Sequence, residues 1–233
     1  MTVILLRHGR SVSNTAHVLA GRAEGIDLDD KGREQAGALV QRIGSLPIRA
    51  LVTSPLLRCR RTLEPLAAAL GLEPIVDERL SEVDYGQWTG RKIGELVKEP
   101  LWSVVQAQPS AAVFPGGEGL ANVQARAVTA VRERDRRLAE EHGGDALWLA
   151  CTHGDVIKAV IADALGTHLD SFQRITADPA SMSVIRYTPL RPFVVHVNHT
   201  GTELASGLVA KPSQTDGAEG VPTGDAVVGG PTD

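Results

Sequence analysis

The chain has 233 residues, of which 42% are hydrophobic and 22% are charged, and its formal net charge is −4. This length allows one large domain with a sizeable core, and the composition is typical of a globular protein in water. The acidic balance argues against general binding to nucleic acid or to an anionic membrane surface, both of which favour basic proteins.

Signals for export or membrane insertion are missing from the sequence. No run of eighteen apolar residues predicts a transmembrane helix, and the opening MTVILL lacks the basic start of a secretory signal. Two cysteines, Cys59 and Cys151, do not make a disulfide framework. We therefore expect a cytoplasmic protein with reduced thiols.

Apolar runs alternate with helical periodicity in the first third of the chain. The run from Thr2 to Leu6 is unbroken, which is typical of a strand buried on both faces. Ser54 is expected to cap a later helix, with Pro55 in its first position. In chain order, the pattern predicts a strand over 2–6, a helix over 11–16, a helix from Asp29 or Asp30 to Pro47, a strand over 49–53, a helix from 54 to Gly71 and a strand over 73–76.

The rest of the chain continues this alternation after a less regular segment at 80–119. From about Thr200 it is rich in Gly, Pro, Thr and Asp, and we expect a disordered tail. The pattern predicts short helices over 92–98 and 101–107, a long amphipathic helix over 118–142 closed by Gly143 and Gly144, a strand over 146–150, a helix over 156–165, and strands over 183–187 and 193–197.

This order of elements predicts an α/β fold. Strands that alternate with helices of ten or more residues form a three-layer sandwich, in which helices flank a mostly parallel central sheet. The irregular segment is expected to be a small helical cap insertion over the carboxyl edge of the sheet, at about 83–118. We expect one domain over 1–200, followed by the tail over 201–233.

Two histidine motifs stand in equivalent places, RHG at 7–9 and THG at 152–154. Each ends an apolar strand and leads into a helix, whose free N–H groups favour an anion. Arg58 follows another strand, within SPLLRCRRT. Ligands bind at the carboxyl ends of strands in open α/β sheets, and a guanidinium group makes paired bonds to phosphate oxygens. The sequence therefore predicts a site for a compact anion such as phosphate.

Taken alone, each of these residues has a simpler interpretation. His8 could be a core histidine, His153 an ordinary polar residue at a strand end, and Arg58 part of a solvated face with Arg60 and Arg61. Their joint placement at three strand ends favours the phosphate site.

Five ordered motifs resemble the histidine phosphatase superfamily, the phosphoglycerate mutase-like group. They are RHGRSVSN, LDDKGREQA, SPLLRCRRT, LSEVDYGQWTG and THG, and together they cover roughly residues 3–197. The segment between Gly90 and PGGE is short and has no Arg-Arg pair, which is similar to the broad phosphatase branch. The chain also resembles an actinobacterial subgroup described as phosphomutases.

The resemblance implies a phosphomonoester hydrolase that acts on a small phosphorylated metabolite through a phosphohistidine at His8. In this interpretation Arg7, Arg58 and His153 hold the phosphoryl oxygens, and Glu82 is the general acid. The nearby carboxylates of Asp77, Glu78 and Asp84 are the alternatives to Glu82. Glu82 is favoured because it precedes Gly86 by four residues, as the family pattern requires.

The resemblance also implies residues that bind the substrate. The expected set consists of Ser11, Asn14, Arg10 and Gly154. Arg10 stands where many members carry Glu or Gln, and its charge suits a substrate with a second anionic group. Arg22, Arg91 and Lys92 are weaker candidates for that duty.

No metal and no cofactor are expected, because arginines can supply the electrostatic stabilisation that a divalent cation gives elsewhere. The sequence has no H-x-x-x-H, paired-Cys, G-x-G-x-x-G or Walker A pattern. Three alternatives stay open: a phosphomutase that uses the same phosphohistidine, a phosphoprotein phosphatase, and a non-catalytic phospho-ligand binding protein. A homodimer is also left open.

Overall fold

A single mixed sheet organises the chain. The structure, a computed structural model, describes residues 1–142 and 146–201. Within them, six strands lie in the order β3-β2-β4-β1-β5-β6. Pairing is parallel from β3 to β1 and antiparallel for β5 and β6, so the predicted, mostly parallel sheet is confirmed. The strands are β1 (Thr2–Arg7), β2 (Ile48–Thr53), β3 (Ile75–Val76), β4 (Leu147–Thr152), β5 (Met182–Tyr187) and β6 (Pro192–His199).

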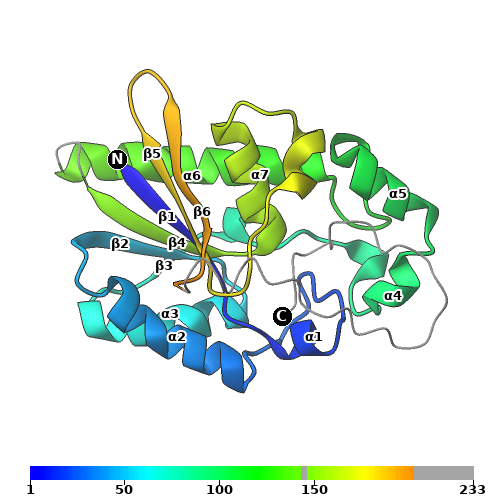
Figure 1. Cartoon of the computed structure of the whole chain (residues 1–233), viewed down its shortest axis with the longest axis horizontal. Coiled ribbons are helices and arrows are strands. Elements are labelled where there is room, and N and C mark those ends of the chain that lie inside the picture. Colours follow the sequence, from blue (N-terminus) through cyan, green and yellow to red (C-terminus); the bar gives the residue numbers. More distant parts are fainter. Residues whose placement is uncertain (143–145, 202–233) are drawn as a thin grey trace.

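Helices cover both faces of this sheet, as a three-layer sandwich requires (Figure 1). α2 and α3 lie on one face, and α6 and α7 on the other. The α-helices are α1 (Val12–Thr15), α2 (Asp30–Ile43), α3 (Leu57–Leu70), α4 (Ile93–Leu96), α5 (Pro100–Ala107), α6 (Leu120–His142) and α7 (Gly154–Ala164). The 3₁₀ helices are η1 (Glu78–Leu80), η2 (Gly86–Trp88), η3 (Pro109–Ala111) and η4 (Leu169–Arg174).

The unbroken apolar run of β1 is explained by burial on both faces. Side chains alternate across a strand, so Val3 and Leu5 join the core under α6 and α7, whereas Ile4 and Leu6 join the core under α2 and α3. A strand in this position has no solvent face on which a polar residue could be tolerated.

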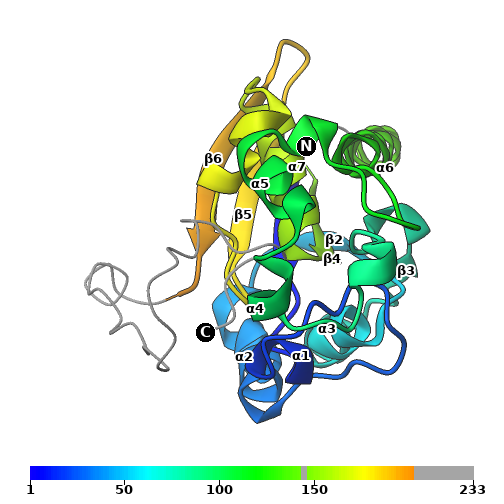
Figure 2. The same ribbon diagram turned by 90° about the vertical axis from the view of Figure 1, so that its right-hand side faces the viewer.

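The segment between β3 and α6 lies beyond the carboxyl ends of the parallel strands, where α4 and α5 stand in front of them (Figure 2). Its apolar centre is aromatic: the Trp88 and Trp102 rings stack with centroids 6.2 Å apart, and Phe114 meets Trp88 edge-on at 5.2 Å. These rings are continuous with the core under α6 and α7. The predicted helical cap over the carboxyl edge is therefore present.

The start of α3 differs from the sequence-based expectation. Ser54 and Pro55 precede the helix, and its N-cap is Leu56, which makes no side-chain capping bond. The expected Ser54 cap is wrong because the helix begins later, at Leu57. The Ser54 hydroxyl accepts from the Leu56 N–H at 3.3 Å, before the helix, and contacts His153 at 2.8 Å. The expected end at Gly71 is confirmed, since that glycine adopts the left-handed conformation at φ 63°.

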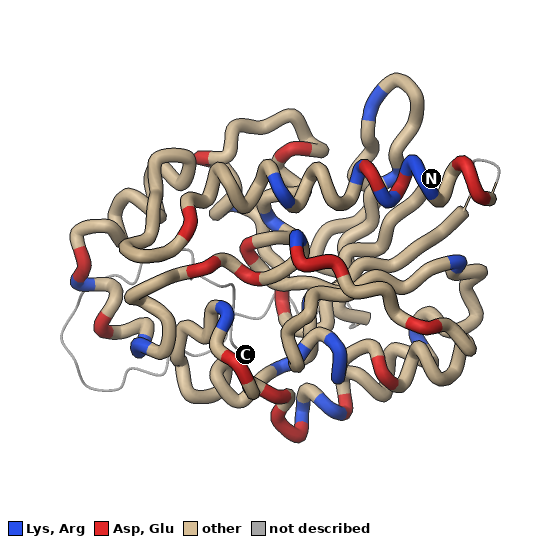
Figure 3. Tube along the Cα trace, turned by 180° about the vertical axis from the view of Figure 1, so that it is seen from behind, with Lys and Arg blue, Asp and Glu red and all other residues tan. Residues whose placement is uncertain are grey.

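Two predictions fall on residues outside the described part of the chain: the helix end at Gly143 and Gly144, and the tail beyond residue 201. None of the helices in the described ranges is long and apolar enough to cross a membrane. Basic and acidic residues are interspersed along the outer helices α2 and α6, whereas α3 carries three arginines and a single acid, Glu64 (Figure 3).

Candidate active site

Strand register brings the two predicted histidines together. β1 and β4 are parallel neighbours with Arg7 opposite Thr152, so the next residue of each strand, His8 or His153, leaves the sheet at the same level. Their ring centroids are 5.2 Å apart, and both side chains are buried. β4 lies between β2 and β1 although it follows both in sequence, which creates the crevice where open α/β sheets bind ligands.

The hydrogen bonds of His8 determine its tautomer. The Arg58 guanidinium can only donate, and its Nε lies 3.2 Å from His8 Nε2, which therefore accepts. The proton is then on Nδ1, which donates to the Gly9 carbonyl at 2.7 Å. Burial, together with the charges of Arg58 and Arg7, holds the pKa of His8 well below its usual value. His8 is thus a neutral imidazole whose Nε2 lone pair is directed at Arg58.

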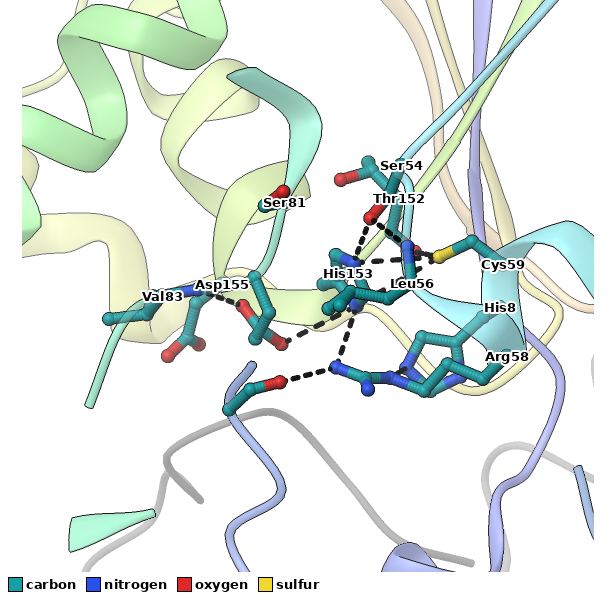
Figure 4. A network of polar contacts seen from close by, with 12 residues as sticks. His8, Ser54, Leu56, Arg58, Cys59, Ser81, Val83, Thr152, His153 and Asp155 are labelled. Atoms are coloured by element: carbon teal, nitrogen blue, oxygen red, sulfur yellow. Dashed lines mark hydrogen bonds and ion pairs between the residues drawn. The ribbon is translucent and has the colours of Figure 1, made fainter. Parts of the chain in front are cut away.

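Arg58 joins the two histidines (Figure 4). Its Nη2 donates to the Gly21 carbonyl at 2.8 Å and lies 3.2 Å from His153 Nδ1. Its Nη1 is buried and makes no hydrogen bond within the described residues. A buried guanidinium with a spare N–H group beside a nucleophilic nitrogen is suited to an anionic oxygen.

His153 has the opposite tautomer to His8. Because Arg58 donates to its Nδ1, its Nε2 carries the proton and donates to Ser54 Oγ at 2.8 Å. Burial and the charge of Arg58 keep the pKa of His153 well below its usual value. Ser54 follows β2, so all three adjacent parallel strands β2, β4 and β1 deliver a polar residue to this cluster.

Arg7 is buried at the end of β1, and its Nη1 donates to the Ala177 carbonyl at 2.7 Å. Burial lowers the pKa of Arg7, against the opposing charges of Glu82, Asp155 and Asp178. The fully buried cation therefore faces three carboxylates from different segments.

Glu82 follows η1 and is 4% exposed. Its Oε1 accepts from the Val83 N–H at 3.0 Å, and its Oε2 lies 3.9 Å from His153 Nδ1. Burial and the charge of Asp155 raise the pKa of Glu82 to about 7, although Arg58 and Arg7 act in the opposite direction. A carboxyl group with such a pKa can both give and take a proton near neutral pH.

Asp155, in the first turn of α7, belongs to a second buried network next to Glu82. The Tyr85 hydroxyl donates to its Oδ2 at 2.9 Å, and Lys158 Nζ lies 3.2 Å from its Oδ1. Lys158 is itself 2% exposed and stands 4.5 Å above the Phe172 ring. Although it is paired with Lys158, the Asp155 carboxylate acts on Glu82 and raises its pKa.

Backbone contacts hold the RHG loop. The Gly9 N–H donates to Thr62 Oγ1 at 2.9 Å, and the Arg10 N–H donates to Gln35 Oε1 at 2.8 Å. The loop also packs directly on α2, because a Cβ on Gly32 would lie 2.0 Å from the Arg10 carbonyl oxygen. The residues of GREQA and the threonine of SPLLRCRRT thus act on the backbone around His8.

The expected substrate-binding residues have different placements. Ser11 caps α1 and exchanges hydrogen bonds with Asn14, whose Oδ1 accepts from the Ser11 hydroxyl at 2.8 Å. Gly154 is the first residue of α7, directly after His153. Arg10 is turned to Asp29, with Nε and Oδ2 2.6 Å apart. The structure thus brings Arg7, His8, Arg58, Glu82 and His153 together and leaves Arg10 in an ion pair.

Two of the three weaker candidates, Arg22 and Arg91, are engaged in contacts within the protein. Arg22 Nε donates to the Glu82 carbonyl at 2.9 Å, and Arg91 forms an ion pair with Glu99 at 2.7 Å. Lys92 is the N-cap residue of α4 and is exposed.

Sequence reasoning missed several residues that support the site. Ser54 was assigned to a helix cap, and Asp155, Tyr85 and Arg126 were given no role. Local signals existed for some of them, since Ser54 directly follows a strand and Asp155 stands in the THGD turn. Arg126 lies in the middle of an amphipathic helix, where nothing in the local pattern sets it apart.

No group of three or more His, Cys, Asp or Glu side chains suited to a metal ion occurs among the residues that the structure describes. Cys59 and Cys151 are buried free thiols. Cys59 Sγ lies 3.5 Å from His153 Nε2 and packs against this cluster from the α3 side.

Comparison with known proteins gives a family match and several relatives. The family model of the histidine phosphatase superfamily (branch 1) matches residues 3–200. Phosphoserine phosphatase 1 of Hydrogenobacter thermophilus is 30% identical over 204 residues, which cover 85% of this chain and 92% of that protein. The probable phosphoglycerate mutase GpmB of Photorhabdus laumondii is 30% identical over 190 residues, covering 80% of this chain and 85% of that protein.

The fold recurs in solved structures. The native structure of mycobacterial glucosyl-3-phosphoglycerate phosphatase superposes with a TM-score of 0.77, at 24% identity, over 85% of this chain and 98% of that chain. This likeness confirms the α/β architecture around the strand-end site.

Proposed function

This chain belongs to the histidine phosphatase superfamily and is an enzyme of phosphoryl transfer, and on that premise we propose that it hydrolyses the phosphomonoester of a small metabolite. The observation that carries the proposal is the pairing of a neutral His8, whose Nε2 lone pair is directed by Arg58, with a buried Glu82 whose pKa is about 7. One group supplies the nucleophile and the other a proton for the leaving oxygen.

In the first proposed step, the Arg58 Nε–H turns from His8 Nε2 to a phosphoryl oxygen, the freed Nε2 lone pair attacks phosphorus, and the ester P–O bond breaks. Glu82 gives its proton to the leaving alkoxide, which departs as the alcohol. The product is a phosphohistidine that keeps its Nδ1 proton. The Gly9 carbonyl, 2.7 Å from Nδ1, stabilises the positive charge on this ring.

In the second proposed step, the Glu82 carboxylate takes a proton from water, whose oxygen attacks phosphorus. The N–P bond breaks, inorganic phosphate leaves, and His8 and protonated Glu82 are restored. Throughout, Arg7 and Arg58 are proposed to hold the phosphoryl oxygens, since charged donors fixed in a dry site stabilise the transition state without reorganising. His153, whose Nδ1 is an acceptor, is proposed to hold a protonated phosphoryl oxygen.

A phosphomutase is the second candidate, because a relative at 30% identity is described as a probable phosphoglycerate mutase. A mutase would return the phosphoryl group of His8 to a second hydroxyl instead of water. The cap favours hydrolysis: it has no Arg-Arg pair for a substrate carboxylate, and Arg91 is paired with Glu99.

The testing experiment is hydrolysis of 4-nitrophenyl phosphate in the presence of a chelator, by the wild type and by His8→Ala. We expect metal-independent release by the wild type and loss of several orders of magnitude in the variant. Phosphate transfer from a phosphorylated metabolite to a second hydroxyl, with no release of phosphate, would favour the mutase. Release that His8→Ala does not abolish would overturn the proposal.

The domain bounds, the location and the oligomeric state of the enzyme are proposals too. We propose residues 1–200 as the catalytic domain, with the cap at about 83–118, and the family match over 3–200 supports these bounds. A cytoplasmic location is supported by the two free thiols. A homodimer would form through the edge strand β6, where the side chains of Phe193, Val195 and Val197 are about half exposed (45%, 48% and 44%). Light scattering measures the mass of the protein in solution and so tests for a dimer.

A further inference from the structure

Three charged side chains far apart in sequence meet behind Glu82. Arg22 comes from the loop after α1, Glu118 from the end of the cap and Arg126 from α6. Glu118 Oε1 accepts from Arg22 Nη2 and from Arg126 Nη2, each at 2.7 Å, and its Oε2 accepts from Arg126 Nε at 3.1 Å. We call these three side chains the Glu118 clamp.

The clamp holds the backbone that carries Glu82. Arg126 Nη1 donates to the carbonyls of Arg79 and Ser81 at 2.6 and 2.8 Å. The Glu82 carbonyl itself accepts twice, from Arg22 Nε at 2.9 Å and from Arg126 Nη2 at 3.2 Å. These carbonyls belong to the one-turn 3₁₀ helix η1 and the residues after it, where no α-helix or strand ladder holds the chain.

The same carboxylate anchors the far side of Glu82. Glu118 Oε1 also accepts from the Asp84 N–H at 2.9 Å, and the Glu118 N–H donates to the Asp84 carbonyl at 2.9 Å. This approach is too close for a side chain, since a Cβ on Gly117 would lie 2.2 Å from the Asp84 carbonyl oxygen. Glu82 is thus fixed between Ser81, which Arg126 of α6 holds, and Asp84, which Glu118 holds.

Ion pairs between Glu118 and the two arginines hold the clamp together. Glu118 and Arg126 are 18% and 17% exposed at their side chains, and Arg22 is 40% exposed. Burial acts to raise the pKa of Glu118, yet hydrogen bonds from Arg126 and the Asp84 N–H bring it below its usual value. The carboxylate therefore stays ionised between two permanent cations at neutral pH.

We propose that Arg126 and Glu118 are positioning residues that hold Glu82 in place for proton transfer to the leaving group, with Arg22 as a weaker third member. The inference rests on the proposed function, because it gives Glu82 a task. Among the described residues, the hydrogen bonds of the clamp go to its own members and to the backbone of 79–84, and none goes to a residue expected at the phosphate. Its loss should therefore impair the proton transfer and spare the phosphate contacts.

The kinetic test uses Arg126→Gln and two substrates in single turnovers with enzyme in excess, which report the phosphorylation step alone. Phenyl phosphate needs a proton on its leaving oxygen, whereas 2,4-dinitrophenyl phosphate does not. Loss of a positioned general acid costs about a hundredfold or more, so we expect about a tenfold or larger loss with phenyl phosphate and less than about twofold with the dinitrophenyl ester.

Three comparisons make this result specific. Arg132 lies on the same helix as Arg126, and Arg132→Gln removes its 2.7 Å ion pair to Asp163 of α7. This control variant should leave the cleavage rates of both substrates unchanged. Glu118→Gln keeps a side-chain oxygen that can accept from the Asp84 N–H, so its rate with phenyl phosphate should lie between those of the wild type and Arg126→Gln. In a Glu82→Gln background, Arg126→Gln should add almost nothing. An equal loss with both substrates, or an additive loss in that background, would overturn the inference.

Amide hydrogen exchange separates failure of the clamp from failure of the proposed function. We expect Arg126→Gln to raise exchange at the amides of Val83 and Asp84, which the wild type protects, while Arg132→Gln leaves it unchanged. Unchanged exchange in Arg126→Gln would refute the clamp whatever the activity. A wild type that cleaves neither ester refutes the proposed function, and exchange still decides the clamp.

Discussion

The two halves of the candidate site are built by different means. The phosphate half, with His8, Arg58 and His153, is assembled at strand ends whose positions follow from the register of β1, β4 and β2. The acid half, around Glu82, lies in irregular chain and is held by side chains that bond to backbone carbonyls. A sheet ladder positions a residue through many cooperative bonds, whereas a loop residue depends on a few specific contacts.

This difference indicates which substitutions should be severe. In the phosphate half, a lost side-chain contact leaves the backbone in place, and damage comes from changed tautomers or steric clashes. In the acid half, a distant side chain can move the functional group. The following experiments test this contrast, from the largest expected effect to the smallest.

The largest effect is expected at Glu82, through pH. With a pKa of about 7 raised by burial and by Asp155, Glu82 is protonated below pH 7 and loses its proton above it. Single-turnover cleavage of phenyl phosphate should therefore fall about tenfold per pH unit above that value. Glu82→Gln should be about a hundredfold slower at pH 6, and its rate should lack the fall above pH 7, the alkaline limb of the pH–rate profile.

His8 should not contribute to the same limb, because its pKa lies well below 6.5 and it stays neutral over this range. The ionisation of the substrate is common to both proteins, so the ratio of the two rates isolates Glu82. A ratio that does not change with pH would contradict the role of Glu82 as the acid.

A steric change should break the phosphate half. Gly32→Ala places a Cβ 2.0 Å from the Arg10 carbonyl oxygen, and we expect a loss of about 1–3 kcal/mol in the free energy of unfolding. Gly37→Ala on the same helix meets no atom within 4 Å and should stabilise by up to about 1 kcal/mol. Denaturant titration measures both, and equal effects would contradict the packing argument.

A tautomer change should weaken the phosphate half less. Ser54→Ala removes the acceptor of the His153 Nε2 proton, so the orientation of Nδ1 is no longer enforced. We expect an about threefold to tenfold weaker affinity for vanadate, measured by calorimetry, in line with the loss of one hydrogen bond. Ser103→Ala removes an exposed hydroxyl that donates to the Pro100 carbonyl. It serves as the control and should leave the affinity for vanadate unchanged.

The smallest effect is expected at Arg10. Its charge is already paired with Asp29, and the two side chains are 25% and 15% exposed. If Arg10 also serves a second anionic group, Arg10→Gln should raise the Michaelis constant for doubly anionic substrates by less than about fivefold and leave singly anionic ones unchanged. Equal constants for both classes would contradict that role.

Much of the phosphate half could be predicted from the sequence. RHG and THG each follow an apolar run, and parallel strands present their carboxyl ends at one edge, so His8 and His153 were expected to meet. Ser54 was misassigned because Ser-Pro before a helical pattern is also a typical helix start. Its partner, His153, lies 99 positions away, beyond any local pattern.

The acid half was predictable only in part. Glu82 was chosen among four nearby carboxylates by its spacing to Gly86, on the family resemblance alone. Its raised pKa depends on burial and on Asp155, and its placement depends on Arg126; both partners lie more than forty residues away. Neither contact leaves a periodic signal, because each joins a loop to the interior of another element.

The sequence by itself determined the strands and helices, the arginine and histidine residues at the strand ends, and the chemistry open to them, because these depend on local apolar patterns and on residue type. The tertiary structure alone decided the insertion of β4 between β2 and β1, the opposite tautomers of His8 and His153, and the clamp behind Glu82. Long-range pairing and burial determine which donor meets which acceptor, and the dielectric around each charge determines its proton affinity.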